Sequence, residues 1–176
     1  MYPVDFAVEI ATSNATLALR LILAAIAGAL IGYEREYMGK AAGLRTYALV
    51  SLGSCLFTLV SVFGVQQLPP VDAPSEFFNY NYDASRIAST VVSGIGFLGA
   101  GSIILRGSRV EGLTTAAGLW VAAALGMAIG FGYYALTGVG VITTLAVLLF
   151  LKRIEPRDHG HEDGPPNGTL PPGVMH

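Results

Sequence analysis

The chain has 176 residues, of which 53% are hydrophobic and only 12% are charged, and its mean hydropathy is +0.59. Soluble domains carry roughly 25% charged residues, so this composition excludes an ordinary soluble domain and indicates a membrane protein. The formal net charge is -2, and the single cysteine excludes an intrachain disulfide. We expect no nucleic-acid partner.

An N-terminal segment, residues 1–15, precedes the first apolar stretch. It contains Asp5 and Glu9 but no Lys or Arg, so it lacks the basic start of a secretory signal peptide. We expect it to be part of the mature protein and to lie outside the cytoplasm.

Five apolar stretches follow, each near the about 20 residues of helix that cross a ~30 Å hydrocarbon layer. They lack the period-2 alternation of a membrane β-barrel and are about twice as long as its strands. The sequence therefore predicts an all-α, polytopic transmembrane helical bundle. Its membrane domain covers residues 16–153, with helices at residues 16–33, 44–66, 86–105, 113–131 and 134–151. Residues 154–176, rich in Pro, Gly, Asp and His, are predicted to be a disordered cytoplasmic tail.

The basic residues predict the orientation of these helices. Eight of the ten Lys and Arg residues lie in or directly beside the loops after the first and third helices or follow the fifth helix, and Lys and Arg in short loops stay on the cytoplasmic side. Only Arg20 and Arg86 fall on the other side, near helix ends where a long side chain can reach water. We expect a bacterial inner-membrane protein with its N-terminus outside and its C-terminus in the cytoplasm.

A weak internal repeat relates the first two helices to the next two. When the chain is shifted by 69 residues, Lys40, Gly43, Leu44, Thr46 and Ala48 coincide with Arg109, Gly112, Leu113, Thr115 and Ala117. One interpretation is two parallel-repeat helical hairpins followed by a fifth helix. The alternative is chance similarity between glycine-rich helices.

Polar residues gather where the predicted helices meet the cytoplasm. Helix N-termini present unpaired N–H groups there, and the nearby carboxylates, hydroxyls and guanidinium groups could hold an ion or an anionic group. The candidate binding or regulatory cluster consists of Glu34, Arg35, Arg45, Thr46, Thr114 and Thr115. The alternative interpretation is a set of stop-transfer charges and helix caps, with a Glu34–Arg45 ion pair closing the loop.

Glycines recur at helical spacing in the apolar stretches. The run from Gly94 to Gly99 matches the dinucleotide-binding fingerprint, but it lies inside an apolar segment with no preceding strand, so that interpretation is rejected. Such spacing favours close helix packing in lipid, or else a thinned helix that lines a permeation path. The residues concerned are Gly28, Gly32, Gly94, Gly96, Gly99, Gly101, Gly126 and Gly130.

Asp83 and Arg86 open the third predicted helix on the outer side, where Asp83 could cap the helix or pair with Arg86. No cluster of residues has the spacing of a metal site or an enzyme active site. We therefore expect no enzyme and no cofactor, with Mg²⁺ entering only as a ligand or a transported ion.

Several ordered blocks, among them Gly28 to Glu36, Ala42 to Gly53, Ser93 to Gly101 and Gly112 to Trp120, resemble the MgtC/SapB family over roughly residues 15–153. The resemblance implies a membrane domain of about five helices with a cytoplasmic C-terminus. Many members continue into a soluble C-terminal domain, which we expect to be missing from this chain. Where members often have a histidine after the Gly-Leu-Arg-Thr block, this chain has Tyr47.

The resemblance implies a role in magnesium or ion homeostasis, which family members fulfil either as transporters or as regulators of other membrane proteins. A path for Mg²⁺ should show carboxylates deep in the helices, and none lies in the middle of a predicted span. We therefore favour an accessory or regulatory protein in the lipid bilayer that binds another membrane protein or forms a homo-oligomer. The alternative is a cation or small-solute transporter or channel that works as an oligomer.

Overall fold

The computed structural model describes residues 13–64 and 84–154. These residues form an all-α bundle of five helices with one small β-hairpin. In chain order the elements are α2 (Asn14–Tyr37), α3 (Leu44–Gly64), α4 (Ala84–Gly101), β1 (Ile104–Arg106), β2 (Arg109–Glu111), α5 (Leu113–Gly130) and α6 (Tyr134–Ile154). The predictions for most of residues 1–15, for Asp83 and for most of the C-terminal tail lie outside the described residues.

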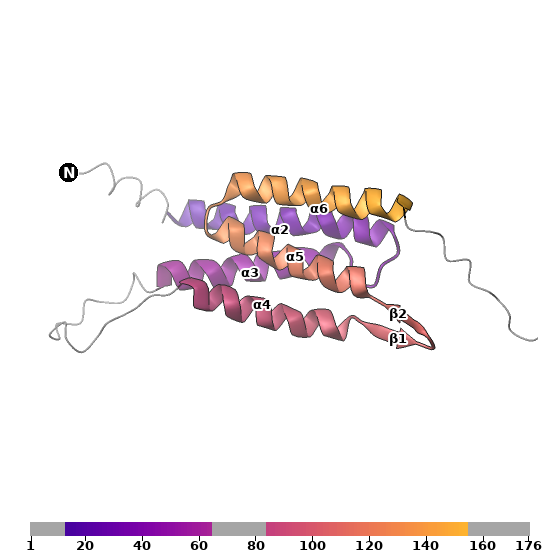
Figure 1. Ribbon diagram of the computed structural model, residues 1–176. Coiled ribbons are helices and arrows are strands. Elements are labelled where there is room, and N and C mark those ends of the chain that lie inside the picture. The colour runs from indigo at the N-terminus through magenta and orange to yellow at the C-terminus, as the bar shows by residue number, and fades with distance from the viewer. Residues whose placement is uncertain (1–12, 65–83, 155–176) are drawn as a thin grey trace, which may run out of the picture.

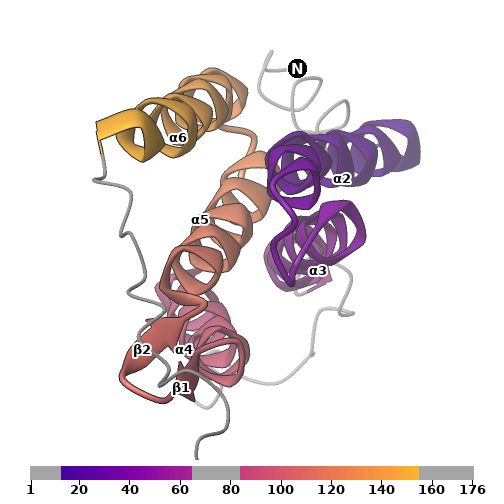
Figure 2. The ribbon, with the colours of Figure 1, turned by 90° about the vertical axis from the view of Figure 1, so that its right-hand side faces the viewer.

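The helices run side by side with the connections alternating between two ends of the bundle (Figure 1). One end holds the α2–α3 turn, the β1–β2 hairpin and the C-terminus of α6, and we call it the β-hairpin end. The opposite end holds the start of α2 and the α5–α6 turn. Helix α5 lies in the middle, with α4 and α6 on either side of it and the α2–α3 pair along its length (Figure 2).

Four of the described helices are long and apolar enough to cross a membrane: Asn14–Tyr37, Leu44–Phe63, Leu113–Gly130 and Tyr134–Leu151. The apolar part of α4, Arg86–Gly101, is shorter. At 1.5 Å per residue, the 18 residues of the whole of α4 span ~27 Å, close to the ~30 Å hydrocarbon core. The bundle is therefore a polytopic membrane protein.

The connection between α4 and α5 differs from the prediction, which continued the third helix to residue 105. Instead α4 ends at Gly101, where the Ser102 hydroxyl donates to the Gly99 carbonyl at 2.7 Å. The β-branched pair Ile103 and Ile104 favours extended backbone, and Gly107 turns the hairpin with φ +61°. The apolar side chains of this segment made it look like a continuation of the helix.

This difference also bears on the predicted repeat. Helices α2 and α4 run in the same direction, as parallel repeats require (Figure 1). In the alignment of the two halves Gly32 matches Gly101, the last residue of α4, whereas α2 continues to Tyr37. The last turn of α2, which carries Glu34 and Arg35, therefore has no helical counterpart in the second half.

The core is built where α2, α3 and α5 approach one another around Ser51. A Cβ atom on Gly28 would lie 2.8 Å from the Ser51 Cβ atom, and one on Gly126 would collide with the Ser51 carbonyl. Two further glycines make similarly close contacts with α3. Gly130 on α5 lies against the side chain of Thr58, and Gly32 on α2 lies against the backbone of Leu44. Lipid offers no hydrophobic driving force between helices, so such close backbone contact supplies the packing energy.

We predict that Gly126→Ala destabilises the bundle by about 1–3 kcal/mol, because the added methyl forces α5 away from Ser51. The free energy of unfolding in mixed micelles measures this. Gly138→Ala on α6 is the matched control, since no neighbouring atom in residues 13–64 and 84–154 lies within 4 Å of a Cβ placed there. Equal stability of the two variants would contradict the close approach of α3 and α5.

Candidate functional site

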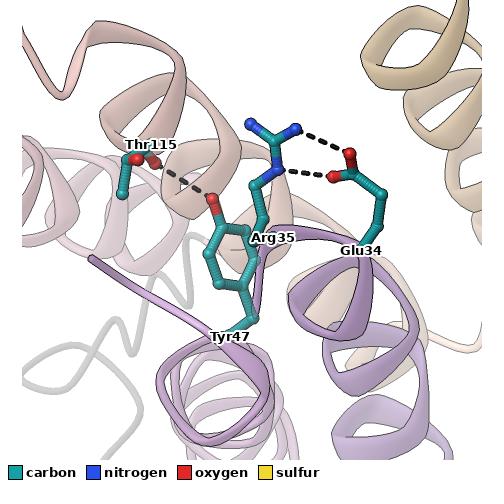
Figure 3. A network of polar contacts seen from close by, with 4 residues as sticks. All are labelled: Glu34, Arg35, Tyr47 and Thr115. Carbon is teal, nitrogen blue, oxygen red and sulfur yellow. Dashed lines mark hydrogen bonds and ion pairs between the residues drawn. The ribbon is translucent and has the colours of Figure 1, made fainter. Parts of the chain in front are cut away.

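A buried ion pair lies in the last turn of α2, at the β-hairpin end. The side chains of Glu34 and Arg35 are only 7% and 3% exposed. Arg35 donates from Nε to one Glu34 oxygen at 2.5 Å and from a terminal nitrogen to the other at 2.8 Å (Figure 3). The predicted Glu34–Arg45 pair is wrong, because Arg35 engages both carboxylate oxygens of Glu34.

Tyr47 joins α3 to α5 beside this ion pair. Its side chain is fully buried, and its hydroxyl donates to the Thr115 carbonyl at 3.2 Å (Figure 3). The ring reaches α5 because Gly118 has no side chain, and a Cβ atom there would collide with the Tyr47 hydroxyl. A buried tyrosine needs such a partner for its hydroxyl, so this contact fixes the spacing of α3 and α5.

The turn between α2 and α3 holds the pair in place. The Leu44 N–H, at the start of α3, donates to a carboxylate oxygen of Glu36 at 2.9 Å, so Glu36 caps α3. The backbone N–H of Lys40 donates to the Arg35 carbonyl at 3.0 Å, and Gly39 takes a left-handed φ of +64°. These bonds close the turn and orient the end of α2 toward α3.

The structure brings together only part of the predicted polar cluster. Glu34, Arg35 and Thr115 lie in the buried network with Tyr47, and we call these four residues the polar network. Arg45 and Thr46 are exposed and line a groove between α3 and α4, whereas Thr114 is exposed on α5. The cluster therefore divides into a buried part and a surface part.

Sequence reasoning missed Tyr47 as a member of the network and Gly118 as the glycine that leaves room for the Tyr47 ring. Tyr47 stood out only as a replacement for histidine, and Gly118 was one of many helix glycines. The available signal was a tyrosine in the first turn of an apolar helix, which must find a hydrogen-bond acceptor when buried.

The polar network combines an ion pair within α2 with one hydrogen bond from α3 to α5. Both Glu34 oxygens accept from Arg35, so an adjacent guanidinium balances the charge of the carboxylate. Among residues 13–64 and 84–154, no three His, Cys, Asp or Glu side chains are grouped so as to hold a metal ion. Removing one member of a buried ion pair leaves an uncompensated charge, which is costly in a low-dielectric interior.

A second buried arginine ties the helices together at the opposite end. Arg20 on α2 donates to the Gly130 carbonyl at 2.9 Å and to the Tyr134 hydroxyl at 3.0 Å. Its guanidinium carbon lies 5.7 Å from the centre of the Phe63 ring. Arg20 is 9% exposed, so it caps the end of α5 and does not extend to water as the sequence suggested.

The glycines of α4 differ from those of the core. A Cβ atom added at Gly94, Gly96 or Gly101 would have no atom within 4 Å, and one added at Gly99 would make only an ordinary contact with Ala116 at 3.5 Å. Within the described chain, the first three therefore pack against nothing, and their role stays a prediction. Arg86 is exposed in the first turn of α4.

The sequence of this bundle matches the MgtC family over residues 21–157. The chain belongs to the MgtC family. The match includes every residue of the polar network. No solved structure matches the chain.

Three relatives place this MgtC-family chain among bacterial proteins. YhiD of Escherichia coli (strain K12), described as a candidate magnesium transporter, is 49% identical over 77% of this chain and 60% of its own length. Protein SrpB of Synechococcus elongatus is 41% identical over 79% of this chain and 76% of its own length. Protein MgtC of Salmonella typhimurium (strain LT2) is 42% identical over 74% of this chain and 51% of its own length. The chain thus spans about half to three fifths of YhiD and MgtC.

We predict that Glu34→Gln lowers the free energy of unfolding by about 3–5 kcal/mol, because it leaves the Arg35 guanidinium buried without a counter-charge. The double variant Glu34→Gln, Arg35→Met should recover most of that loss. Unfolding in mixed micelles, analysed as a double-mutant cycle, measures the coupling.

Glu111→Gln is the control for this cycle. Glu111 pairs with Arg106 at 3.6 Å across the exposed β-hairpin, so its loss should cost only about 0–1 kcal/mol. If Glu34→Gln lowered the free energy of unfolding no more than Glu111→Gln does, the Glu34–Arg35 pair would not be a buried ion pair.

Proposed function

We propose that this protein takes part in magnesium homeostasis as an accessory or regulatory membrane protein that acts on another membrane protein. The family and the description of YhiD support the link to magnesium. Because Lys and Arg gather at the β-hairpin end, we assign that end to the cytoplasm of a bacterial inner membrane.

The observation that supports the regulatory role is where the carboxylates lie and which groups they bind. Among the described residues, only Glu34, Glu36 and Glu111 carry carboxylates, and all three lie at the β-hairpin end. Glu34 is neutralised by Arg35 and Glu36 caps α3. Mg²⁺ requires oxygen ligands or its water shell, and the middle of each described span offers no carboxylate to replace them.

The packing of the three central helices supports the same role. Side chains and backbone fill the space around Ser51, Cys55 and Thr58, all of which are buried. A path through α2, α3 and α5 would need these helices to separate at their glycine contacts. We infer that they form a rigid, non-enzymatic scaffold whose outer surfaces contact a partner.

Flux through purified protein in sealed liposomes that contain a Mg²⁺-sensitive dye tests this function. With and without a membrane potential, we expect no Mg²⁺ entry above that of protein-free vesicles, while an ionophore added at the end gives full entry. In cells that need the protein for growth at low Mg²⁺, expression of the same chain should restore growth. Flux that Glu34→Gln, Arg35→Met abolishes would overturn the regulatory role and favour direct transport by an oligomer.

A further inference from the structure

An open apolar groove of about 900 Å³ runs between α3 and α4. Its walls include Leu49, Phe57 and Val60 on α3 and Val91, Ile95 and Leu98 on α4. Helix α4 packs mainly on α5, so the described residues leave the face of α3 beside it uncovered, and Phe57 is 67% exposed. In a bilayer this surface faces the acyl-chain layer.

Two glycines deepen the groove from opposite walls. Gly53 on α3 and Gly94 on α4 both line it, and no atom of a neighbouring described residue lies within 4 Å of where their Cβ atoms would be. From Arg45 to Ser61, the α3 wall rises by 16 residue steps, or ~24 Å at 1.5 Å per residue. The acyl chains of one leaflet span about half of the ~30 Å hydrocarbon core, or ~15 Å. The groove is therefore long enough for one acyl chain.

The charge of the groove is confined to one end. Arg45 is the one charged side chain among the described residues that line it, whereas hydroxyl groups, those of Thr46, Ser54, Ser61 and Thr90, are spread along it. Arg45 and Thr46 stand at the β-hairpin end, where both are exposed. They add a positive charge and a hydroxyl to one end of a groove that is otherwise mostly apolar. This pattern matches a molecule with an anionic head and an apolar chain, whereas a partner helix would need no charge at one end.

We propose that the α3–α4 groove binds an anionic phospholipid from the leaflet at the β-hairpin end. One acyl chain lies between Gly53 and Gly94, and the phosphate group lies against Arg45 and Thr46. The lipid covers the apolar face that the bundle leaves open. This inference does not depend on whether the protein transports Mg²⁺, so a flux result leaves it unchanged.

Native mass spectrometry tests the proposal on the full chain, purified with equal amounts of phosphatidylglycerol and phosphatidylcholine of identical acyl chains. The wild type should retain phosphatidylglycerol in preference. Arg45→Gln should reduce that preference by about fivefold, the effect of one basic residue near an anionic membrane surface. Lys40→Gln is its control, because Lys40 is exposed at the same end but does not line the groove.

A second pair of variants tests the acyl-chain part of the site. Gly53→Leu should fill the groove and remove both bound lipids, whereas Gly138→Leu, which also adds a side chain to open space, should remove neither. Equal retention of the two lipids by the wild type, or equal behaviour of Arg45→Gln and Lys40→Gln, would overturn the proposal. So would a lipid-free dimer that Gly53→Leu dissociates, which would make the groove an interface between two copies.

Discussion

Helices α2, α3 and α5 touch through their backbones, because Gly28 and Gly126 place no side chain between themselves and Ser51. Lipid surrounds the bundle and offers no hydrophobic driving force between helices. Van der Waals contact between the closely packed backbones is therefore a main source of stability. Once these three helices are fixed, α5 presents Gly118 to Tyr47, and Arg20 reaches the end of α5. Helices α4 and α6 then pack on α5 from either side (Figure 2).

The packing of the helices buries the Glu34–Arg35 pair. This burial also limits the ability of Glu34 to bind an ion. A buried charge at the end of a membrane helix is costly unless an opposite charge binds it. Here two hydrogen bonds join the guanidinium of Arg35 to the carboxylate of Glu34. Such a pair is poorly suited to releasing and rebinding a divalent ion. The polar network therefore fits a scaffold in which Tyr47 joins α3 to α5 and the ion pair stays closed within α2, while the surface at Arg45 and the α3–α4 groove stays open for binding.

The helices themselves could be predicted from sequence, since long apolar stretches have few alternatives to a helix in a bilayer. The β-hairpin could not, because Ile103 to Leu105 are as apolar as the helix before them. The alternative pairing of Glu34 with Arg45 was also wrong: Arg35 binds both Glu34 oxygens, although neighbouring residues on a helix usually point apart. Tyr47 reaches Thr115 only because Gly118 leaves room, which is a tertiary contact and invisible in one sequence.

The closed core is tested most directly by the reactivity of Cys55, the single cysteine, which is fully buried on α3. In native membranes, a charged methanethiosulfonate reagent added to the water should leave Cys55 unmodified, and the same reagent should modify it after unfolding. Lys40→Cys in a Cys55→Ala background should react at once, since Lys40 is exposed. Rapid modification of Cys55 in the folded protein would reveal an aqueous path among α2, α3 and α5 and would contradict the scaffold account.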